Sequence, residues 1–204
     1  MNSTGIIVLA AGASVRMGSP KQLLQVNGST LLRHTVQEAL RAACGPVLLV
    51  LGANENEMRS EVAHLDTETV VNEEWREGMG ASIRAGIAAL QSMHPECGAA
   101  VIMVSDQPLV HSGLVKELVS THQTTAKSIV ACRYADSFGP PVLFQSGFFP
   151  QLLSLHGDTG AKALVKQHMN EVAFINFEAG MVDLDTKKDY EQFIKRRTHD
   201  YRQL

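Results

Sequence analysis

Residues 6–21 read IIVLAAGASVRMGSPK, and this stretch decides the fold. Its first four residues are apolar without alternation, which predicts a central parallel strand covered on both faces. The residues from Ala10 to Ser14 are all small, so backbone N–H groups there can approach an anion closely. Arg16 and Lys21 then add two positive charges. A buried strand, a small-residue loop and two cations together predict a site for a polyphosphate.

Two other phosphate-binding loops do not match this stretch. A P-loop ends in Gly-Lys-Ser/Thr, but here Ser19 and Pro20 separate Gly18 from Lys21. The dinucleotide-binding fingerprint needs three closely spaced glycines, and only Gly12 and Gly18 are present. An ordinary strand–helix connection remains an alternative, although such loops usually have about two to six residues.

Composition favours one soluble enzyme domain over residues 1–204. The net charge of −3 argues against a general nucleic-acid-binding surface. Three scattered cysteines suit neither a disulfide framework nor a zinc site, so we expect a reducing cytoplasm. The start of the chain lacks signal-peptide features, and no apolar run approaches the ~20 residues that span a membrane.

Apolar segments alternate with helical ones along the chain. Strands are expected at 6–9, 47–51, 69–72, 99–104 and 128–132, with helices between them. This alternation predicts a single α/β domain with three layers, α/β/α, around a Rossmann-like, mostly parallel sheet. Pro140 and Pro141 cannot donate ladder hydrogen bonds, so a late strand that follows them is expected to be antiparallel, at an edge or outside the main sheet. A further strand is expected at 172–175.

Two more small-residue loops open onto predicted helices. Residues 78–82 read GMGAS, with a helix expected from Ser82, and residues 156–162 read HGDTGAK. A helix N-terminus offers unpaired N–H groups that suit an anion or a polar base edge. In each case a plain glycine turn or a capped helix is the alternative.

Acidic residues follow two apolar segments. Asp106 comes directly after the strand expected at 99–104, where an unpaired carboxylate costs several kcal/mol to bury. A carboxylate in that position suits Mg²⁺, which takes one or two carboxylates together with phosphate oxygens. The alternative is that Asp106 caps the helix expected from His111. Near the end of the chain, Thr186 and Asp189 have the spacing of a capping box.

The stretch Leu9-Ala10-Ala11-Gly12, with Ser14, Arg16-Met17-Gly18 and Lys21, resembles the signature of nucleotidyltransferases with a MobA-like NTP transferase domain. The Gly157–Ala161 segment is similar to that of the molybdenum cofactor cytidylyltransferase group in particular. The resemblance covers nearly the whole chain. Asp106-Gln107-Pro108 is similar to the metal-binding Asp-x-Pro of the family. The segment from Asp183 also matches, although Lys187 replaces a proline that is common there.

This resemblance implies a role for each matching residue. The implied catalytic residues are Arg16, Lys21 and Asp106. The implied metal ligands are Asp106 and Asp185, with Asp183 as a weaker candidate. The implied nucleotide-binding residues are Leu9, Ala10, Ala11, Gly12, Ser14, Arg16, Lys21, Gly80, Ala81 and Ser82. The implied acceptor-binding residues are Gly139, Pro141, Gly157, Asp158, Thr159, Gly160 and Ala161. Tyr134 and Phe138 either contact a flat pterin ring or simply pack.

The resemblance also implies a reaction: Mg²⁺-dependent transfer of CMP from CTP to the terminal phosphate of molybdopterin, or molybdenum cofactor, with release of pyrophosphate. Similar guanylyltransferases tend to have glycine where this chain has Ala11, and the methyl group would narrow the pocket toward a pyrimidine. One alternative is a cytidylyltransferase for another small phosphorylated acceptor. Another is a non-catalytic maturation factor that delivers the cofactor to a molybdenum hydroxylase.

Overall fold

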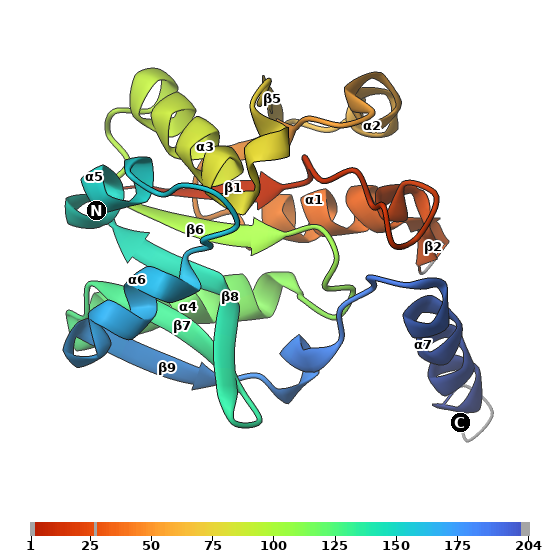
Figure 1. Ribbon diagram of the computed structural model, residues 1–204. Helices are drawn as coiled ribbons and strands as arrows, with labels where there is room; N and C mark the ends of the chain where they lie inside the picture. The colour runs from red at the N-terminus through yellow and green to blue at the C-terminus, as the bar shows by residue number, and fades with distance from the viewer. Residues whose placement is uncertain (1–2, 27, 201–204) are drawn as a thin grey trace.

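A seven-stranded sheet forms the centre of the molecule, in the order β5-β4-β1-β6-β8-β7-β9 (Figure 1). The structure is a computed structural model that describes residues 3–26 and 28–200, the side chains of 197–200 excepted. The ends of the expected domain range, residues 1–2 and 201–204, therefore lie outside the described residues. The strands of this sheet are β1 (Thr4–Leu9), β4 (Val47–Leu51), β5 (Glu68–Val71), β6 (Ala99–Val104), β7 (Ile129–Tyr134), β8 (Ser137–Gln145) and β9 (Val172–Asn176).

Strand β1 lies between two parallel neighbours, as its apolar sequence predicts. Ile6 is in register with Val47 of β4 on one side and with Val101 of β6 on the other. Every residue of β1 is buried. Parallel strands end at the same edge of a sheet, so the loops after β1, β4 and β6 meet there.

The antiparallel orientation of β8 is confirmed, but the expectation that it lies at an edge is wrong. Strand β8 runs antiparallel between β6 and β7, well inside the sheet. The β7–β8 register shifts between Ala131, which faces Val142, and Cys132, which faces Gly139. Pro140 and Pro141 fall in this irregularity. Because the ladder is interrupted there, the missing proline donors cost no strand-pairing hydrogen bonds.

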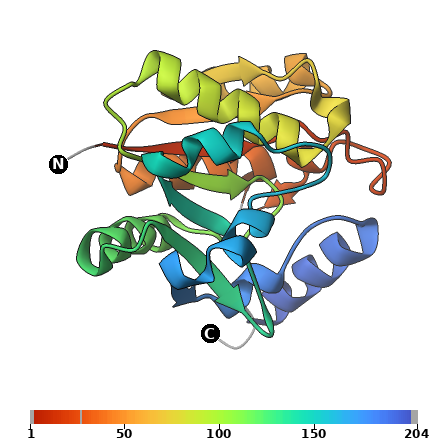
Figure 2. The same cartoon turned by 60° about the vertical axis from the view of Figure 1, so that its left-hand side comes forward.

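Helices cover both faces of the sheet and give the three expected layers (Figure 2). One core joins the sheet to α1 (Leu31–Ala42), α2 (Glu55–Val62) and α4 (Ser112–Thr125). The other joins it to α3 (Met79–Met93), α5 (Phe149–Leu153) and α6 (Lys162–Gln167). Apolar side chains alternate between the two faces along β1, with Ile6 and Val8 in the first core and Ile7 and Leu9 in the second.

The last helix, α7 (Lys187–Asp200), stands beside the N-terminal half of the molecule (Figure 1). A small third core of Val26, Leu31, Leu184 and Phe193 holds it against the short hairpin of β2 (Gln25–Val26) and β3 (Ser29–Thr30). Packing of this core brings the segment before α7 to the same sheet edge as the loop after β1.

The starts of α3 and α4 bear on two expectations from the sequence: where α3 begins, and whether Asp106 caps α4. Helix α3 begins at Met79 and not at Ser82, because Gly78, with φ of 107°, makes the turn that precedes it. Helix α4 is capped by the His111 side chain, which accepts from Leu114 N at 3.2 Å. Asp106 is thus free of the capping role. Among the described residues, every helix is too short or too polar to cross a lipid bilayer.

Candidate active site

The loop after β1 is held in shape by one buried side chain. The Gln22 amide donates to the backbone oxygens of Ala10 at 3.2 Å and Gly12 at 3.0 Å. Its own oxygen accepts from Ser14 Oγ at 3.1 Å, and the same hydroxyl accepts from Lys21 N, also at 3.1 Å. Ser14 adopts the left-handed conformation, with φ of 54°. These hydrogen bonds fix the conformation of the loop that contains Arg16 and leads to Lys21. Sequence reasoning missed the role of Gln22.

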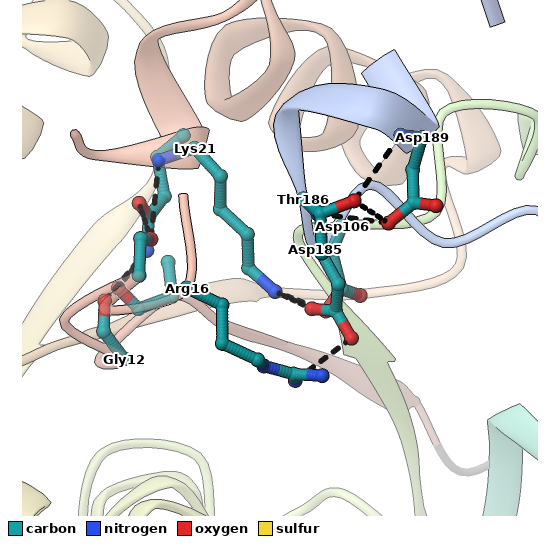
Figure 3. A network of polar contacts seen from close by, with 10 residues as sticks. Gly12, Arg16, Lys21, Asp106, Asp185, Thr186 and Asp189 are labelled. Atoms are coloured by element: carbon teal, nitrogen blue, oxygen red, sulfur yellow. Dashed lines mark hydrogen bonds and ion pairs between the residues drawn. The ribbon is translucent and has the colours of Figure 1, made fainter. Parts of the chain in front are cut away.

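Two cations and two carboxylates from distant parts of the chain meet beside this loop (Figure 3). Lys21 Nζ lies 2.7 Å from Asp106 Oδ2 and 2.7 Å from Asp185 Oδ1. Arg16 Nη2 lies 2.9 Å from Asp185 Oδ2. The two positive charges of Arg16 and Lys21 balance the two carboxylates, and the ion pairs between them hold the four side chains together.

The pKa values follow from these contacts. Burial alone lowers the pKa of Lys21, but the charge and hydrogen bond of Asp106, with help from Asp185, outweigh burial and raise it. Burial alone raises the pKa of Asp185, but Lys21 and then Arg16 outweigh burial and lower it. Lys21 is thus fully protonated and Asp185 fully ionised near neutral pH.

Asp185 reaches the site through two local features. The backbone N–H of Leu184 donates to Asp106 O at 2.9 Å, which fixes the segment beside the end of β6. Thr186 and Asp189 then cap α7 reciprocally, with Thr186 N donating to Asp189 Oδ2 at 2.8 Å and Asp189 N to Thr186 Oγ1 at 3.2 Å. The predicted capping pair is confirmed.

The two carboxylates make a chemically suitable but incomplete site for Mg²⁺. Asp106 Oδ2 and Asp185 Oδ1 both contact the Lys21 ammonium, so one oxygen of each carboxylate points to the same place. Among the described residues there is no cluster of three or more His, Cys, Asp and Glu side chains for a metal. A two-carboxylate set still fits Mg²⁺, which commonly takes its other ligands from phosphates and water.

Asp183 lies beside this cluster without joining it. Its side chain is exposed and lines a separate hollow with residues such as Leu109, Met181 and Phe193. Partial desolvation, and then the nearby charge of Asp106, raise the pKa of Asp183 to about 6. Of the two alternating acids, Asp185 is the one placed with Lys21.

A cleft of about 350 Å³ opens beside the loop. Arg16, Lys21 and Asp106 of the charged cluster line it, whereas Asp185 is not among the described residues of its wall. Nine of the predicted site residues line it: Leu9, Ala10, Ala11, Gly12, Arg16, Lys21, Ser82, Asp106 and Asp158. The wall also contains Gln22, Trp75, Gly78, Met79, Val104 and Ser105. Sequence reasoning missed Trp75. It is the single tryptophan of the chain and lies just before the second small-residue loop, and this position is the signal that could have identified it as a cleft residue.

The second and third small-residue loops pack directly on each other. Gly80 N donates to Gly157 O at 3.0 Å. A Cβ at Gly78 would meet Asp158 Oδ1 at 2.5 Å and Gly157 O at 2.7 Å. Glycine is therefore required for this close approach. Gly80 and Ala81 are buried, and neither is among the described residues of the cleft wall, so their nucleotide-binding role stays a prediction.

Arg84 and Asn72 hold this wall from behind. Arg84 donates to Leu155 O at 2.6 Å and to carboxylates of Glu74 and Glu77, each at 2.8 Å. The buried Asn72 side chain donates to Ser82 Oγ at 3.1 Å. Sequence reasoning missed Asn72, which is the last residue of the strand expected at 69–72 and carries no motif of its own.

The remaining acceptor candidates stand away from the cleft wall. As far as the described residues define that wall, it does not include Gly139, Pro141 or residues 159–161. A Cβ at Gly139 would collide with the Tyr134 hydroxyl, and one at Gly180 with the Tyr134 ring. Phe138 packs against Phe174, with ring centroids 5.7 Å apart. The contacts of Tyr134 and Phe138 thus favour packing, and the acceptor roles of the other residues stay predictions.

Several known proteins are similar to this chain in sequence and in fold. Nicotine blue oxidoreductase of Paenarthrobacter nicotinovorans is 33% identical over 80% of this chain and 81% of its own length. Purine catabolism protein PucB of Bacillus subtilis is 27% identical over 91% of this chain and 93% of its own. Among solved structures, Rv0371c of Mycobacterium tuberculosis superposes with a TM-score of 0.82 at 32% identity, covering 95% of this chain and 98% of that one. A further structure of Rv0371c, at 31% identity and a TM-score of 0.78 over the same shares, is a complex with manganese.

A family model gives the most specific match. The model for the MobA-like NTP transferase domain matches residues 6–172, which include the loop after β1, the small-residue turn before α3 and Asp106. These are the segments that build the cleft. The chain belongs to the MobA-like NTP transferase domain family of nucleotidyltransferases.

Proposed function

We propose that this protein transfers CMP from CTP to the terminal phosphate of molybdenum cofactor and releases pyrophosphate. The observation that carries the proposal is the position of Lys21, whose ammonium contacts Asp106 and Asp185 at the rim of a tied, small-residue loop. Cations at such a loop suit a triphosphate, and paired carboxylates suit the metal that accompanies it.

The triphosphate lies over the loop from Ala11 to Lys21. Lys21 and Arg16 turn from the carboxylates toward the phosphate oxygens and offset the charge that grows in the transition state. Asp106 and Asp185 would hold Mg²⁺, since an oxygen of each carboxylate points to the same place. The metal, when bound, would neutralise phosphate charge and polarise the α-phosphate. That a similar protein, Rv0371c, forms a complex with manganese supports a divalent ion here.

The acceptor supplies its own nucleophile. A phosphate monoester is already anionic near neutral pH, so its oxygen can attack the α-phosphorus while pyrophosphate leaves, without a strong general base. Catalysis then consists of positioning and charge neutralisation. We assign the acceptor to the side of the cleft where Asp158 stands, next to the loop that contains Gly157 and Gly160.

We base the preference for CTP on Ala11 and Trp75, which both line the cleft. Gly52 lies so close to Ala11 that a Cβ there would meet the Ala11 Cβ at 2.9 Å, and Trp75 packs on the same glycine. The Ala11 methyl group is therefore held rigidly in the cleft wall. A smaller pyrimidine base suits this wall better than a purine.

A molybdenum hydroxylase is the proposed recipient of the product. One relative is named for nicotine blue and another for purine catabolism. Both names refer to nitrogen heterocycles, which supports a recipient enzyme that acts on such compounds. The free cysteines Cys44, Cys97 and Cys132 suit the reducing cytoplasm that we propose as the compartment. Transfer to another small phosphorylated acceptor, or delivery of the cofactor without catalysis, are the competing functions.

A substrate panel tests the proposal. Pyrophosphate release is measured with each of the four NTPs, with Mg²⁺, and with molybdenum cofactor, sugar phosphates or no acceptor. We expect release only with CTP and molybdenum cofactor. Pyrophosphate release with a different acceptor would show that this compound, and not molybdenum cofactor, is the acceptor. Tight binding of CTP without pyrophosphate release would favour the non-catalytic maturation factor. Because one relative is named an oxidoreductase, oxidation of NAD(P)H by the same sample serves as a control and should be absent.

A further inference from the structure

Asn72 is held in one orientation behind the cleft. It follows β5 directly, is buried, and its backbone N–H donates to Leu51 O at 2.8 Å. Its side-chain oxygen accepts from Glu74 N at 3.0 Å. A backbone N–H can only donate, so the amide oxygen must face Glu74 and the amide NH₂ must face Ser82.

This orientation decides what Ser82 can offer. Ser82 is buried in the first turns of α3, lines the cleft, and accepts from Asn72 Nδ2 at 3.1 Å. A hydroxyl has one proton to donate, and an amide NH₂ cannot accept it. Within the part of the chain that the structure describes, Ser82 Oγ donates to no protein acceptor. The proton is therefore available to a ligand in the cleft.

We propose that Asn72 is a positioning residue for nucleotide selection: it fixes Ser82 as a hydrogen-bond donor to an acceptor atom of the nucleobase. This inference rests on the proposed nucleotide site. Cytosine presents N3 as an acceptor, whereas uracil carries a proton on N3. Because both bases carry the same O2 acceptor, the inference commits the Ser82 donor to N3. There it favours cytosine, since a site built around one hydrogen bond rejects the analogue that cannot form it.

A role in shaping the turn accounts for only one of the two side-chain hydrogen bonds of Asn72. The bond from Glu74 N to Asn72 shapes the turn before α3 and would exist without any ligand. The bond to Ser82 adds nothing to that turn, yet it determines the polarity of the one hydroxyl that Asn72 contacts in the cleft wall. The two roles differ in what they predict for nucleotide preference.

An Asn72→Asp variant separates these roles. The introduced carboxylate keeps the acceptor for Glu74 N but also accepts from Ser82, so the hydroxyl turns its proton away from the cleft. Trp75, the single tryptophan and a cleft residue, reports binding through its fluorescence. We expect the Kd for CTP to rise about tenfold, the change that one hydrogen bond of 1.4 kcal/mol produces. The Kd for UTP should change less, so the preference for CTP over UTP falls.

Three controls complete the experiment. An Asn56→Asp variant adds the same charge at an exposed position and should keep the wild-type preference. A Ser82→Ala variant should lose the preference, and adding Asn72→Asp to it should change the CTP to UTP ratio no further. The Ser82→Ala variant also keeps the test informative if Asn72→Asp fails to fold.

The contradicting results are distinct. An unchanged CTP to UTP ratio in both the Asn72→Asp and the Ser82→Ala variants would overturn the inference. Equal weakening of both nucleotides would also overturn it, since that result is expected from a structural role or from a bond to the O2 that both bases share. If no NTP binds the wild type, the proposed function itself fails, which is a separate outcome.

Discussion

A Lys21→Met variant removes the charge at the centre of the site while keeping an unbranched side chain of similar length. Loss of one preorganised electrostatic donor costs about 2.7–4 kcal/mol in the transition state, which is a factor of about 10²–10³ in rate. Lys21 contacts two carboxylates at 2.7 Å each, so it is the most engaged cation of the cluster. We therefore expect kcat/KM for pyrophosphate release to fall by at least that factor.

The fold should survive this change. The Lys21 side chain is 14% exposed, and those of Asp106 and Asp185 are 22% and 30% exposed. Such pairs stand between surface ion pairs, worth about 0–1 kcal/mol, and fully buried ones, whose disruption costs about 3–5 kcal/mol. Asp185 also keeps Arg16 as a partner. We expect the free energy of unfolding to fall by about 1–2 kcal/mol.

The assay combines pyrophosphate release with urea unfolding on the same preparation. Lys188→Met is the matched control, because Lys188 is exposed and outside the cleft wall. A folded Lys21→Met protein with kcat/KM within threefold of wild type would refute the reasoning. A protein that fails to fold would show that Lys21 stabilises the fold by more than the expected 1–2 kcal/mol and would contradict this stability prediction.

Three further predictions follow from local geometry. A Gly78→Ala variant should lose about 2 kcal/mol or more in urea unfolding, because its φ of 107° and the oxygens of the neighbouring loop exclude a Cβ, whereas Gly147→Ala, with open space, should be nearly neutral. An Asp106→Asn variant should bind Mn²⁺ in the presence of CTP more weakly by at least the roughly 10- to 100-fold that loss of an outer-shell partner costs, as counted by electron paramagnetic resonance of free Mn²⁺; unchanged binding would remove Asp106 from the metal site. His94 has a raised pKa, first because of its hydrogen bond to Glu68, so its stabilising effect is present below pH 6.5 and is lost as the pH rises through the raised value. A His94→Gln variant should therefore be destabilised more at pH 5.5 than at pH 9, and the opposite order in urea unfolding would contradict this.

The sheet was largely predictable because its strands are continuous apolar runs. Residues 6–9, 47–51 and 99–104 each became a buried parallel strand, since only a strand covered on both faces needs such a run. The position of β8 was not predictable from Pro140 and Pro141. Proline is excluded from a regular ladder, but a register shift in the partner strand provides an interior position where no donor is needed. That shift depends on how β7 and β8 pair, which a local pattern does not contain.

The candidate site was predictable where residues carry a motif and not where they act through buried contacts. Asp106 closely follows the end of β6, and Lys21 closes the small-residue loop after β1, at the sheet edge where ligands of open α/β sheets bind. Gln22 and Asn72 have ordinary neighbours in the sequence, and their importance comes from partners that only the fold brings near, such as Gly12 O and Ser82 Oγ. The sequence pattern predicts the start of α3 three residues late, because Met79 and Gly80 are typical of a loop. In the structure, Gly157 O accepts from Gly80 N, which satisfies a backbone N–H of the first helical turn.

The central claim is attack on the α-phosphorus of CTP by a phosphorylated acceptor, and isotope tracing tests it most directly. The wild-type protein is incubated with Mg²⁺, molybdenum cofactor and CTP that carries the label on either the α- or the γ-phosphate, and the products are separated. We predict that the α-label moves into the cofactor and the γ-label into pyrophosphate, and that both transfers disappear in Lys21→Met. Appearance of the γ-label as inorganic phosphate or on the acceptor, with the α-label left in CDP, would contradict the account.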